Sequence, residues 1–355
     1  MAISINKIDK PKINEVNAKD LGFGKFVTDH MLVAQYDNGW QLPTIMPYGN
    51  ISISPAAKVL HYGQSIFEGL KAYKINEEQI AIFRLQDAFE RFNNSAARMA
   101  MPDVPKEIFI NGIRELVKLD KAWMPKDNDA SIYIRPVMFA TEVGVGVAPA
   151  TQYQFIIFLS LAGKYYSRPV KLKIETQYAR VSKGGTGYAK ASANYAVSLY
   201  PTLKAQEEGF DQVIWTDSTT HTLIEEAGVM NIMCIIGDTL ITPDLNDRIL
   251  PGITRKTIIQ IVKDNPDGSL KDIKEVQERP LSVKEVVEAY ENGTLKEVFG
   301  VGTAAVIQKI RAISYKDKLM EFDTDNYFIS DKIHECFNNV RQGKFDEYKS
   351  WLDVL

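Results

Sequence analysis

The most regular hydrophobic pattern in the chain is helical and begins at Leu85, in "LQDAFERFNNSAARMAMP". Its apolar residues recur at helical spacing, which places them on one face of a helix that ends before Pro102. A second helix is expected just after Gly252, in "PGITRKTIIQIVKD". A third is expected over residues 192–209, kinked or shifted by Pro201 because proline cannot donate the hydrogen bond that a helix interior needs.

Continuous apolar runs elsewhere predict buried strands. "ASIYIRPVMF" and "TQYQFIIFLSLAG" are too apolar for surface strands, and "YIRP" alone suggests a strand that ends at Pro136. Shorter strands are expected in "DQVIWTD", "EAGVMNIMCII" and "TLITP". A turn at residues 37–39 marks a hairpin between two β-rich runs, and "KEVFGVGTAAVIQKI" predicts two strands joined by a glycine turn.

The length of 355 residues predicts two domains, and the first half of the chain mixes strands and helices. The pattern changes in "GKYYSRPVKLKI", which is rich in tyrosine and basic residues and contains Pro169. We therefore expect a small N-terminal domain over residues 1–165, an interdomain linker over 166–178 and a larger domain over 179–355.

Composition and charge restrict the possible partners. The net charge is −3 and the basic residues are scattered, so no nucleic-acid-binding surface is expected. No apolar run is long enough to span a membrane, and the N-terminus lacks the apolar segment of a secretory signal. Cys234 and Cys336 are isolated and the four histidines form no cluster, so we expect neither a disulfide framework nor a metal site. These features favour a cytoplasmic protein.

The glycine-rich stretch "KGGTGYAKASANY", which begins at Lys183, has two possible functions. A phosphate-binding P-loop would require the pattern G-x-x-x-x-G-K-[ST]. The window that begins at Gly184 has Ala189 in place of the second glycine and Ala191 in place of the hydroxyl residue, so this hypothesis is weak. The alternative is a reactive amine at Lys190, because the small neighbours would let a flat ring approach and burial can make a lysine nucleophilic. Taken alone, Lys190 is more simply a solvated surface lysine.

A lysine that held pyridoxal phosphate would need three further groups. The pyridine nitrogen needs a carboxylate, the phosphate needs an arginine or a helix N-terminus, and the phenolic oxygen needs a donor. Arginines spaced like those in "FRLQDAFERFNNSAARM", and carboxylates at strand ends, are more often solvated. The candidates for the carboxylate and the phosphate site are Glu225, Glu226, Arg91, Ile253 and Thr254.

Taken together and in this order, eight motifs resemble those of the branched-chain amino acid aminotransferases, which are pyridoxal-phosphate enzymes of fold type IV. The resemblance covers nearly the whole chain and rests on "TDHM", "LHYGQSIFEGLKAY", "FRLQDAFERF", "YIRP", "GTGYAKASANY", "EEAGVMN", "LPGITR" and "VFGVGTAAV". It implies an α+β fold with a small N-terminal α/β domain and a larger pseudo-barrel domain, pyridoxal 5′-phosphate as the cofactor and a homodimer.

The resemblance also implies roles for individual residues. Lys190 would form the Schiff base with the cofactor and carry the substrate proton. The other cofactor-binding residues would be Tyr195 at the phenolic oxygen, Glu226 at the pyridine nitrogen, and Arg91, Ile253, Thr254 and Thr303 around the phosphate. The substrate-binding residues would be Phe67, Val147 and Tyr165 in an apolar lining, Tyr62, Tyr133 and Arg135 as a polar set, and Thr303 and Ala304 at the α-carboxylate, with Val147 supplied by the partner subunit.

The implied activity is reversible ping-pong transamination, in which L-leucine, L-isoleucine or L-valine gives its amino group to 2-oxoglutarate. A D-amino acid aminotransferase, an amine transaminase or an aminodeoxychorismate lyase of the same fold would share Lys190 and Glu226. These enzymes should differ at Tyr133, Arg135 and the "GTA" turn. From other classes, a nucleotide-binding switch that uses residues 184–190, or a non-catalytic relative kept for assembly, are the alternatives.

Overall fold

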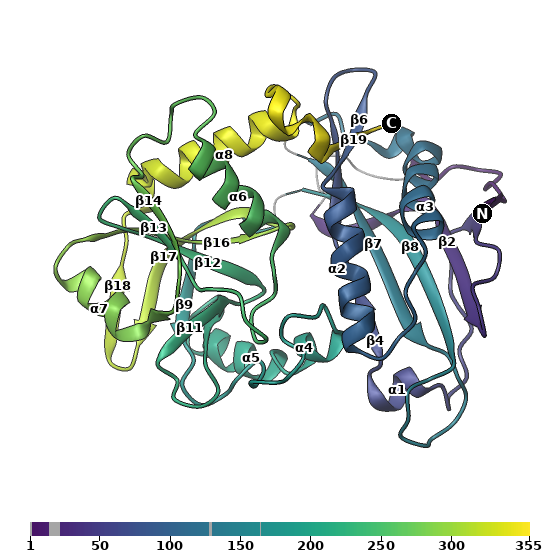
Figure 1. Ribbon diagram of the computed structural model, residues 1–355, viewed down its shortest axis with the longest axis horizontal. Coiled ribbons are helices and arrows are strands. Elements are labelled where there is room, and N and C mark those ends of the chain that lie inside the picture. Colours follow the sequence, from purple (N-terminus) through teal and green to yellow (C-terminus); the bar gives the residue numbers. More distant parts are fainter. Residues whose placement is uncertain (1, 14–21, 128–129, 164) are drawn as a thin grey trace. The chain divides into compact units, whose positions relative to one another are not determined.

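Each of two units of the chain is organised around its own β-sheet (Figure 1). The computed structural model describes residues 2–13, 22–127, 130–163 and 165–355. The first unit comprises Met1–Tyr165, Ala189–Ala193 and Arg341–Leu355. The second unit comprises Tyr166–Tyr188 and Asn194–Val340.

These units differ from the predicted domains in three places. Residues 189–193 and 341–355 belong to the first unit, although they follow the predicted boundary. The predicted linker over 166–178 contains β9 (Val170–Ile174), which is a strand of the second sheet. Pairing between segments far apart in the chain decides all three differences, and a local pattern does not show which strand a segment joins. Residues 1, 14–21, 128–129 and 164 of the predicted first domain lie outside the described residues.

The first sheet is antiparallel except for one parallel pair at its edge, β1 with β3. The two predicted buried strands are confirmed as β7 and β8, and the predicted hairpin is confirmed by the pairing of β2 with β3. Along the sheet the strands lie in the order β1 (Ser4–Ile5), β3 (Thr44–Pro47), β2 (Phe23–Asp37), β8 (Gln152–Ala162), β7 (Ser131–Ala140), β5 (Leu70–Lys74), β6 (Ile80–Phe83) and β19 (Leu352–Val354), with β4 (Ser65–Phe67) beside β7.

Strand β7 does not end at Pro136 but continues to Ala140. The Pro136 carbonyl accepts a hydrogen bond from the Glu68 N–H at 2.8 Å, at the point where β4 has ended and β5 has not yet begun. In an antiparallel strand the N–H and the C=O of one residue face the same neighbour. The N–H that proline lacks would therefore face the same neighbour, between β4 and β5, so the missing hydrogen bond falls where the ladder on that side is interrupted and the strand continues past it.

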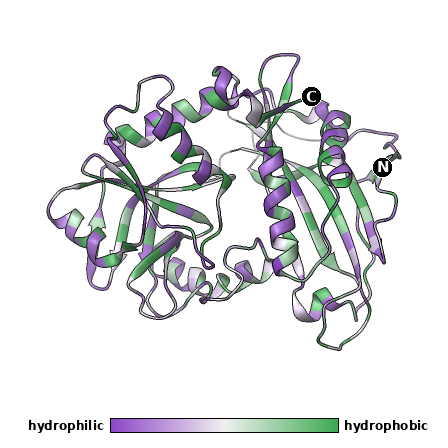
Figure 2. Cartoon of the chain, viewed as in Figure 1, coloured by the Kyte–Doolittle hydropathy of each residue, from purple (hydrophilic) through white to green (hydrophobic). Residues whose placement is uncertain are grey.

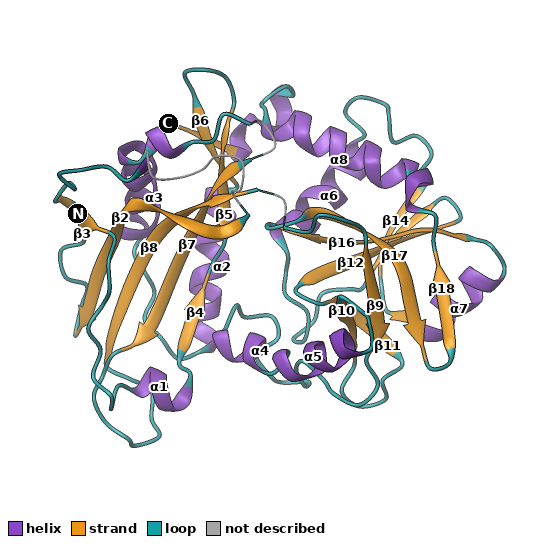
Figure 3. Ribbon diagram, turned by 180° about the vertical axis from the view of Figure 1, so that it is seen from behind, coloured by secondary structure: helices purple, strands orange, loops and turns teal. Residues whose placement is uncertain are grey.

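Two helices cover one face of the first sheet, as the front and back views show (Figures 1 and 3): α2 (Leu85–Arg98) and α3 (Lys106–Leu119). The first of them confirms the predicted helix. Its buried Phe92 packs against Phe109 of α3 and Phe155 of β8, at ring-centroid distances of 5.3 and 5.4 Å. Arg84 and Arg91 are also buried, so this arginine stripe is not a solvated helix face. The remaining short helices of this unit are α1 (Lys58–Tyr62), η2 (Lys121–Trp123) and η4 (Asp346–Trp351).

The second sheet closes on itself and forms the expected pseudo-barrel. An additional pairing of β11 with β12 joins the two arms of the sheet, so that β9, β10, β11, β12, β16 and β17 form a ring. The strands lie in the order β14 (Glu275–Glu278), β13 (Thr239–Thr242), β12 (Met230–Ile236), β16 (Leu295–Gly302), β17 (Val306–Tyr315), β9, β10 (Gln212–Thr216), β11 (Leu223–Ala227) and β15 (Leu281–Ser282), with β18 (Lys318–Glu321) beside β17.

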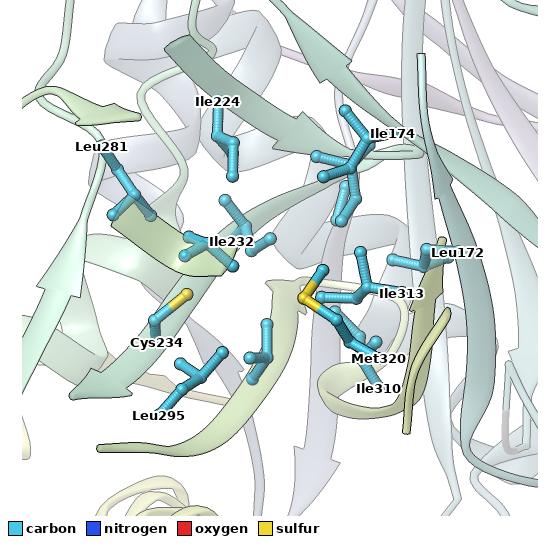
Figure 4. Close-up of a cluster of buried hydrophobic side chains, with 14 of the residues drawn as sticks. Leu172, Ile174, Ile224, Ile232, Cys234, Leu281, Leu295, Ile310, Ile313 and Met320 are labelled. Carbon is cyan, nitrogen blue, oxygen red and sulfur yellow. The ribbon is translucent and has the colours of Figure 1, made fainter. Parts of the chain in front are cut away.

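Hydrophobic side chains of this sheet form a buried cluster (Figure 4). Alternate residues of β9, namely Val170, Leu172 and Ile174, contribute to it, as the two-residue period of a strand requires. Figure 2 shows that the strands of both units are predominantly hydrophobic and the connecting loops largely hydrophilic. None of the helices in the described ranges is long and apolar enough to cross a membrane. The other helices are α4 (Ser192–Ala196), α5 (Leu199–Glu207), α6 (Ile253–Asp264), α7 (Val283–Glu291), η3 (Thr324–Asn326) and α8 (Phe328–Arg341).

The single helix predicted over residues 192–209 is wrong, because the structure has two helices, α4 and α5, there. A proline ring collides with the carbonyl of the residue four positions earlier, which for Pro201 is Val197. The break falls at residues 197–198 and removes that collision. It also places Pro201 in the first turn of α5, where an N–H would lack a helical partner. The helix predicted after Gly252 is confirmed as α6.

We expect Phe92→Ala to lower the free energy of unfolding by about 3–5 kcal/mol, since it removes a fully buried aromatic side chain and leaves a cavity. Urea denaturation followed by circular dichroism measures this loss. As a control, Leu319→Ala, at a position where the side chain is 46% exposed, should change the value by less than about 0.5 kcal/mol. Equal effects for the two variants would contradict the assignment of Phe92 to the core.

Candidate active site

The segment around Lys190 is held by hydrogen bonds to the rest of the first unit. The Lys190 N–H donates to the Ser95 Oγ at 2.9 Å, and the Lys190 carbonyl accepts from the Phe67 N–H at 3.1 Å. The next residue, Ala191, forms an isolated antiparallel bridge with Ile66. Both backbone polar groups of the candidate lysine are therefore bound, one by α2 and one by the end of β4.

The Lys190 amine lies over an aromatic ring. Its Nζ is 4.9 Å from the centroid of the Phe67 ring, within the range of a cation–π contact. The side chain of Lys190 is half-buried rather than solvated. This placement limits the amine to one face of Phe67, a residue predicted to line the substrate pocket.

Arg91 forms a buried ion pair with Glu68. Its Nε and Nη2 donate to the two carboxylate oxygens at 2.8 and 2.5 Å. Glu68 is fully buried and Arg91 is 7% exposed, so each charge needs the other. The Gly69 N–H also donates to Glu68, at 2.7 Å, which helps to keep the carboxylate in place.

Arg135 and Tyr133 form a second group, on the same face of β7. The Arg135 Nη2 donates to the Tyr133 hydroxyl at 3.0 Å, and the guanidinium carbon lies 4.7 Å from the Phe67 ring centroid and 5.2 Å from that of Tyr133. The buried Arg135 Nε has no hydrogen-bond partner, and among the described residues Arg135 has no ion pair. A cation held between two rings without a counter-ion is suited to receive an anionic ligand group.

Gly69 gives Tyr133 its position. A Cβ at residue 69 would lie 1.9 Å from the Tyr133 hydroxyl oxygen, so any side chain there would displace the phenol. Glycine is the one residue that allows this close approach. The order of Phe67, Glu68 and Gly69 in "FEG" thus places an aromatic wall, a counter-ion for Arg91 and a space for Tyr133.

The other predicted lining residues of the first unit are not all near this group. Tyr165 contacts Phe23 edge-on at 4.9 Å, and Phe23 contacts Tyr133 in the same way, so Tyr165 is joined to the group through one ring. Tyr62 instead donates to the Val145 carbonyl, in the loop that carries Val147. Tyr62 is 40% exposed and Val147 is 85% exposed.

In the second unit Glu226 is a buried carboxylate that contacts hydrogen-bond donors. The Leu250 N–H donates to its Oε1 at 2.7 Å, and the Arg180 Nη2 lies 3.2 Å from the same oxygen. Asn231, which pairs with Glu226 across β11 and β12, donates its Nδ2 to the Leu250 carbonyl at 3.0 Å. The hairpin formed by "EEAGVMN" therefore fixes the backbone that leads into α6 and the position of the Glu226 carboxylate.

The N-terminus of α6 presents backbone N–H groups. Gly252 is its N-cap residue and supplies no side-chain cap, and the first turn contains no acidic residue. Ile253 and Thr254 are the first two helical residues, so their N–H groups have no partner within the helix. Such a terminus favours an anionic group through its N–H donors and the helix dipole.

The glycine-rich loop before Lys190 packs against protein backbone, which further weakens the P-loop hypothesis. A Cβ on Gly187 would lie 2.4 Å from the Arg248 carbonyl oxygen, and the Tyr188 N–H donates to the Asp247 carbonyl at 3.2 Å. Arg248 in turn forms an ion pair with the buried Glu225. Burial raises the pKa of the Glu225 carboxyl, and the Arg248 partner opposes this rise. Glu225 therefore anchors the loop.

The remaining predicted site residues of the second unit lie in a short helix and in a turn between two strands. Tyr195 lies in α4, and its carbonyl accepts from the N–H and the Oγ of Ser198. Thr303 and Ala304 lie in the turn between β16 and β17 and are half-buried. Val301, two residues earlier, pairs with Asn231 across β16 and β12, so this turn begins close to the Glu226 hairpin.

Several residues that hold these groups together were missed by the sequence analysis. A lone acid between apolar strands, as at Glu68, and a serine on the apolar face of a helix, as at Ser95, both indicate a buried hydrogen bond. Arg180 and Arg248 carry no comparable signal, because they lie in polar loops. The residues concerned are Glu68, Ser95, Arg180, Asn231 and Arg248.

Comparison with known proteins identifies relatives over nearly the whole chain. The family described as "Amino-transferase class IV" matches residues 65–313. The chain is 42% identical to the "Probable branched-chain-amino-acid aminotransferase" of Staphylococcus aureus (strain N315) over 346 residues, 96% of this chain and 94% of the relative. It is 39% identical to "Branched-chain-amino-acid aminotransferase 2" of Bacillus subtilis (strain 168) over 355 residues, 98% of this chain and 95% of the relative.

Solved structures of branched-chain aminotransferases are also similar to this chain. The branched-chain aminotransferase from Thermoproteus uzoniensis with norvaline has a TM-score of 0.74 at 26% identity and covers 92% of this chain and 99% of that chain. The branched-chain amino acid aminotransferase from Escherichia coli has a TM-score of 0.73 at 24% identity and covers 92% of this chain and 98% of that chain. At this lower identity the second likeness concerns the fold alone.

The chain therefore belongs to the class IV aminotransferases. The predicted resemblance to the branched-chain amino acid aminotransferases is confirmed, and so is the fold of type IV.

Lys71, on β5, allows a pH-dependent test of the sheet face that carries Tyr133. It lies opposite Tyr133 in the sheet register, and burial, followed by the nearby Arg341, lowers the pKa of its ammonium from 10.5 to about 8. Between these values the unfolded chain binds a proton that the folded chain has released. The contribution of Lys71 to stability should therefore rise with pH in this window, by up to about 1.4 kcal/mol per pH unit.

Comparison with Lys71→Met isolates this contribution. The unfolding free energy of the wild type minus that of the variant should increase between about pH 8 and pH 9.5. Lys74→Met, on the same strand, is the control and should show no such increase. A flat difference for Lys71→Met would contradict a buried ammonium at this position.

Proposed function

We propose that this protein catalyses the transfer of the amino group of L-leucine, L-isoleucine or L-valine to 2-oxoglutarate, giving the branched 2-oxo acid and L-glutamate. The main support for this proposal is the environment of Arg135. Ping-pong transamination requires one pocket to accept an apolar side chain and then a carboxylate. The rings of Phe67 and Tyr133 supply an apolar wall, and Arg135 is a cation between them that has no counter-ion among the described residues. The names of the relatives support the same substrates.

We propose pyridoxal 5′-phosphate as the cofactor, because the donor set fits its chemistry. The N–H groups at the start of α6 lack a side-chain cap and suit a phosphate, to which Arg91 and Thr303 would also contribute. The Glu226 carboxylate, held by Arg180 and the Leu250 N–H, suits a protonated pyridine nitrogen. Tyr195 would donate to the phenolic oxygen. Lys190 and Tyr195 are five residues apart, so the chain itself keeps these two near one another.

Lys190 would bond the cofactor and then move the substrate proton. When bound, the cofactor accepts the electron pair left as the substrate Cα loses its proton. Lys190 would take that proton from the substrate Cα and return it on the cofactor side, with its amine kept in place by the Phe67 ring. Glu226 would hold the pyridine nitrogen from a position that Arg180 and the Leu250 N–H fix.

The substrate-binding residues would divide by chemistry. The backbone N–H groups of Thr303 and Ala304 would bind the α-carboxylate that every substrate shares. Arg135 and Tyr133 would bind the second carboxylate of glutamate and 2-oxoglutarate, and Phe67 and Tyr165 would contact the branched side chain. This division explains how one pocket accepts two kinds of substrate.

We also propose a homodimer in the cytoplasm. Tyr62, Val145 and Val147 are exposed next to one another and are apolar enough to need cover, which the partner subunit would supply. Val147 would then complete the pocket of the partner. Cys234 and Cys336 are both buried, and neither forms a disulfide within the described part of the chain, which suits a reducing compartment. Sedimentation velocity tests the assembly, and a monomer would contradict it.

We expect Lys190→Ala to lower transamination of L-leucine by 2-oxoglutarate at least about a hundredfold, because the variant lacks the group that bonds the cofactor and carries the proton. A coupled assay for glutamate measures the rate. Lys183→Ala, in the same loop at an exposed position, is the matched control and should retain the wild-type rate.

The same assay with a substrate panel distinguishes the alternatives within the fold. Branched L-amino acids should be the preferred donors. Preference for D-amino acids or simple amines, or pyruvate release from a chorismate derivative, would replace the proposed activity by one of the alternative enzymes. A normal rate in Lys190→Ala would remove Lys190 from its proposed role.

We expect Arg135→Met to raise the KM for 2-oxoglutarate by about 10- to 100-fold and to change the KM for L-leucine much less. The variant keeps the apolar bulk of the side chain and loses the charge that would bind the second carboxylate. Arg168→Met, which removes an exposed arginine paired with Asp211, is the control. An equal loss for both substrates would show that Arg135 does not discriminate between them.

A further inference from the structure

Ser95 connects the two candidate residues of the first unit that would hold opposite ends of the cofactor. Its Oγ donates to the Arg91 carbonyl, four residues earlier in α2, at 2.9 Å. The same oxygen accepts the Lys190 N–H at 2.9 Å. Ser95 is fully buried, so one hydroxyl bridges the turn that carries Arg91 and the backbone that carries Lys190.

The first of these bonds is common in helices and would not assign a function by itself. Serine often returns a hydrogen bond to the carbonyl one turn earlier. The second bond is different, because it joins residues 95 positions apart and satisfies a backbone donor outside any helix or sheet ladder. Without Ser95 the Lys190 N–H would lose its acceptor in a largely buried segment, where an unpaired donor is costly.

Arg91 is held equally firmly on the same face of the helix. Residues four apart lie one above the other along a helix, separated by about 6 Å of rise. Glu68 holds the Nε and Nη2 of Arg91 through two parallel hydrogen bonds, a geometry that fixes the plane of the guanidinium. One turn of α2 therefore presents a fixed arginine and a fixed hydroxyl to the lysine segment.

We propose that Ser95 is a positioning residue for Lys190, and that this turn of α2 sets the separation between the lysine and the phosphate-binding arginine. This inference rests on the proposed function, in which Lys190 bonds the cofactor and Arg91 binds its phosphate. Ser95 acts through the backbone of Lys190 and touches neither substrate nor cofactor. The rigid turn gives the flat cofactor a fixed span between its two attachment points.

Amide hydrogen exchange in the cofactor-free protein tests the contact directly. We expect Ser95→Ala to speed exchange of the Lys190 amide by about tenfold or more, as loss of one buried hydrogen bond would. The matched control is Ser330→Ala in α8, which also removes a fully buried helical hydroxyl, one that has no hydrogen-bond partner in the described structure. This control should leave Lys190 exchange unchanged. Wild-type exchange in Ser95→Ala would overturn the proposal.

Kinetics of the loaded enzyme test the positioning itself. Ser95→Ala should lower kcat with L-leucine by about tenfold while the KM changes by less than about twofold, because the lysine is displaced and the substrate site is not. A rise in KM alone would overturn the positioning role.

If Ser95→Ala fails to fold, Ser95→Thr and Ser95→Val test the same proposal, because the two side chains share a shape and differ in the hydroxyl. Thr should retain slow exchange and kcat, and Val should lose both; equal behaviour of the two would overturn the proposal.

The result of the Ser95 test can be distinguished from the result of the test of the proposed function. If the wild type binds no pyridoxal phosphate and transfers no amino group, the proposed function fails. The exchange comparison in the cofactor-free protein still decides whether Ser95 holds Lys190. If the wild type is active and Ser95→Ala equals it in both measurements, this inference alone fails.

Discussion

The hydrogen bonds on the backbone of Lys190 are the constraint on which the candidate site depends. The N–H is bound by Ser95 of α2 and the carbonyl by Phe67 at the end of β4, so a segment of five residues packs with the first unit although the residues on either side belong to the second. A side chain with four rotatable bonds adopts one attack geometry more readily when its backbone is fixed. Fixing the backbone leaves the Lys190 amine only its own torsions, and the Phe67 ring restricts those further.

Charge is arranged around this segment in two different ways. Arg91 is paired with Glu68 in a fully buried contact, which holds the guanidinium still and offsets its charge. Arg135 lies between two rings and has no ion pair among the described residues, so its charge is available to a ligand. The first arrangement favours a permanent role in holding a cofactor. The second favours a substrate carboxylate that comes and goes, as an aminotransferase with two alternating substrates requires.

The sequence predicted the regular elements well and the interruptions poorly. Helix α2 and strands β7 and β8 follow from their periodicity, because each buries one face or both faces of a local segment. Pro136 suggested a strand end, yet its missing N–H faces the gap between β4 and β5. Pro201 suggested that one helix is kinked or shifted, and the structure has a break at residues 197–198, after which a new helix starts two residues before the proline. At Pro136 the neighbouring strands decide the result, and at Pro201 the proline ring itself does.

By itself the sequence determined the order of the motifs, the two-part α+β organisation and the family, since these depend on residue identity and local period. Only the tertiary structure showed that β11 pairs with β12 to close the second sheet, that residues 341–355 return to the first unit, and that Glu68 and Ser95 hold Arg91 and Lys190. The physical reason is the separation along the chain between the residues that interact. Periodicity records which face of a segment is buried, whereas a hydrogen bond between residues 95 positions apart exists only once the chain has folded.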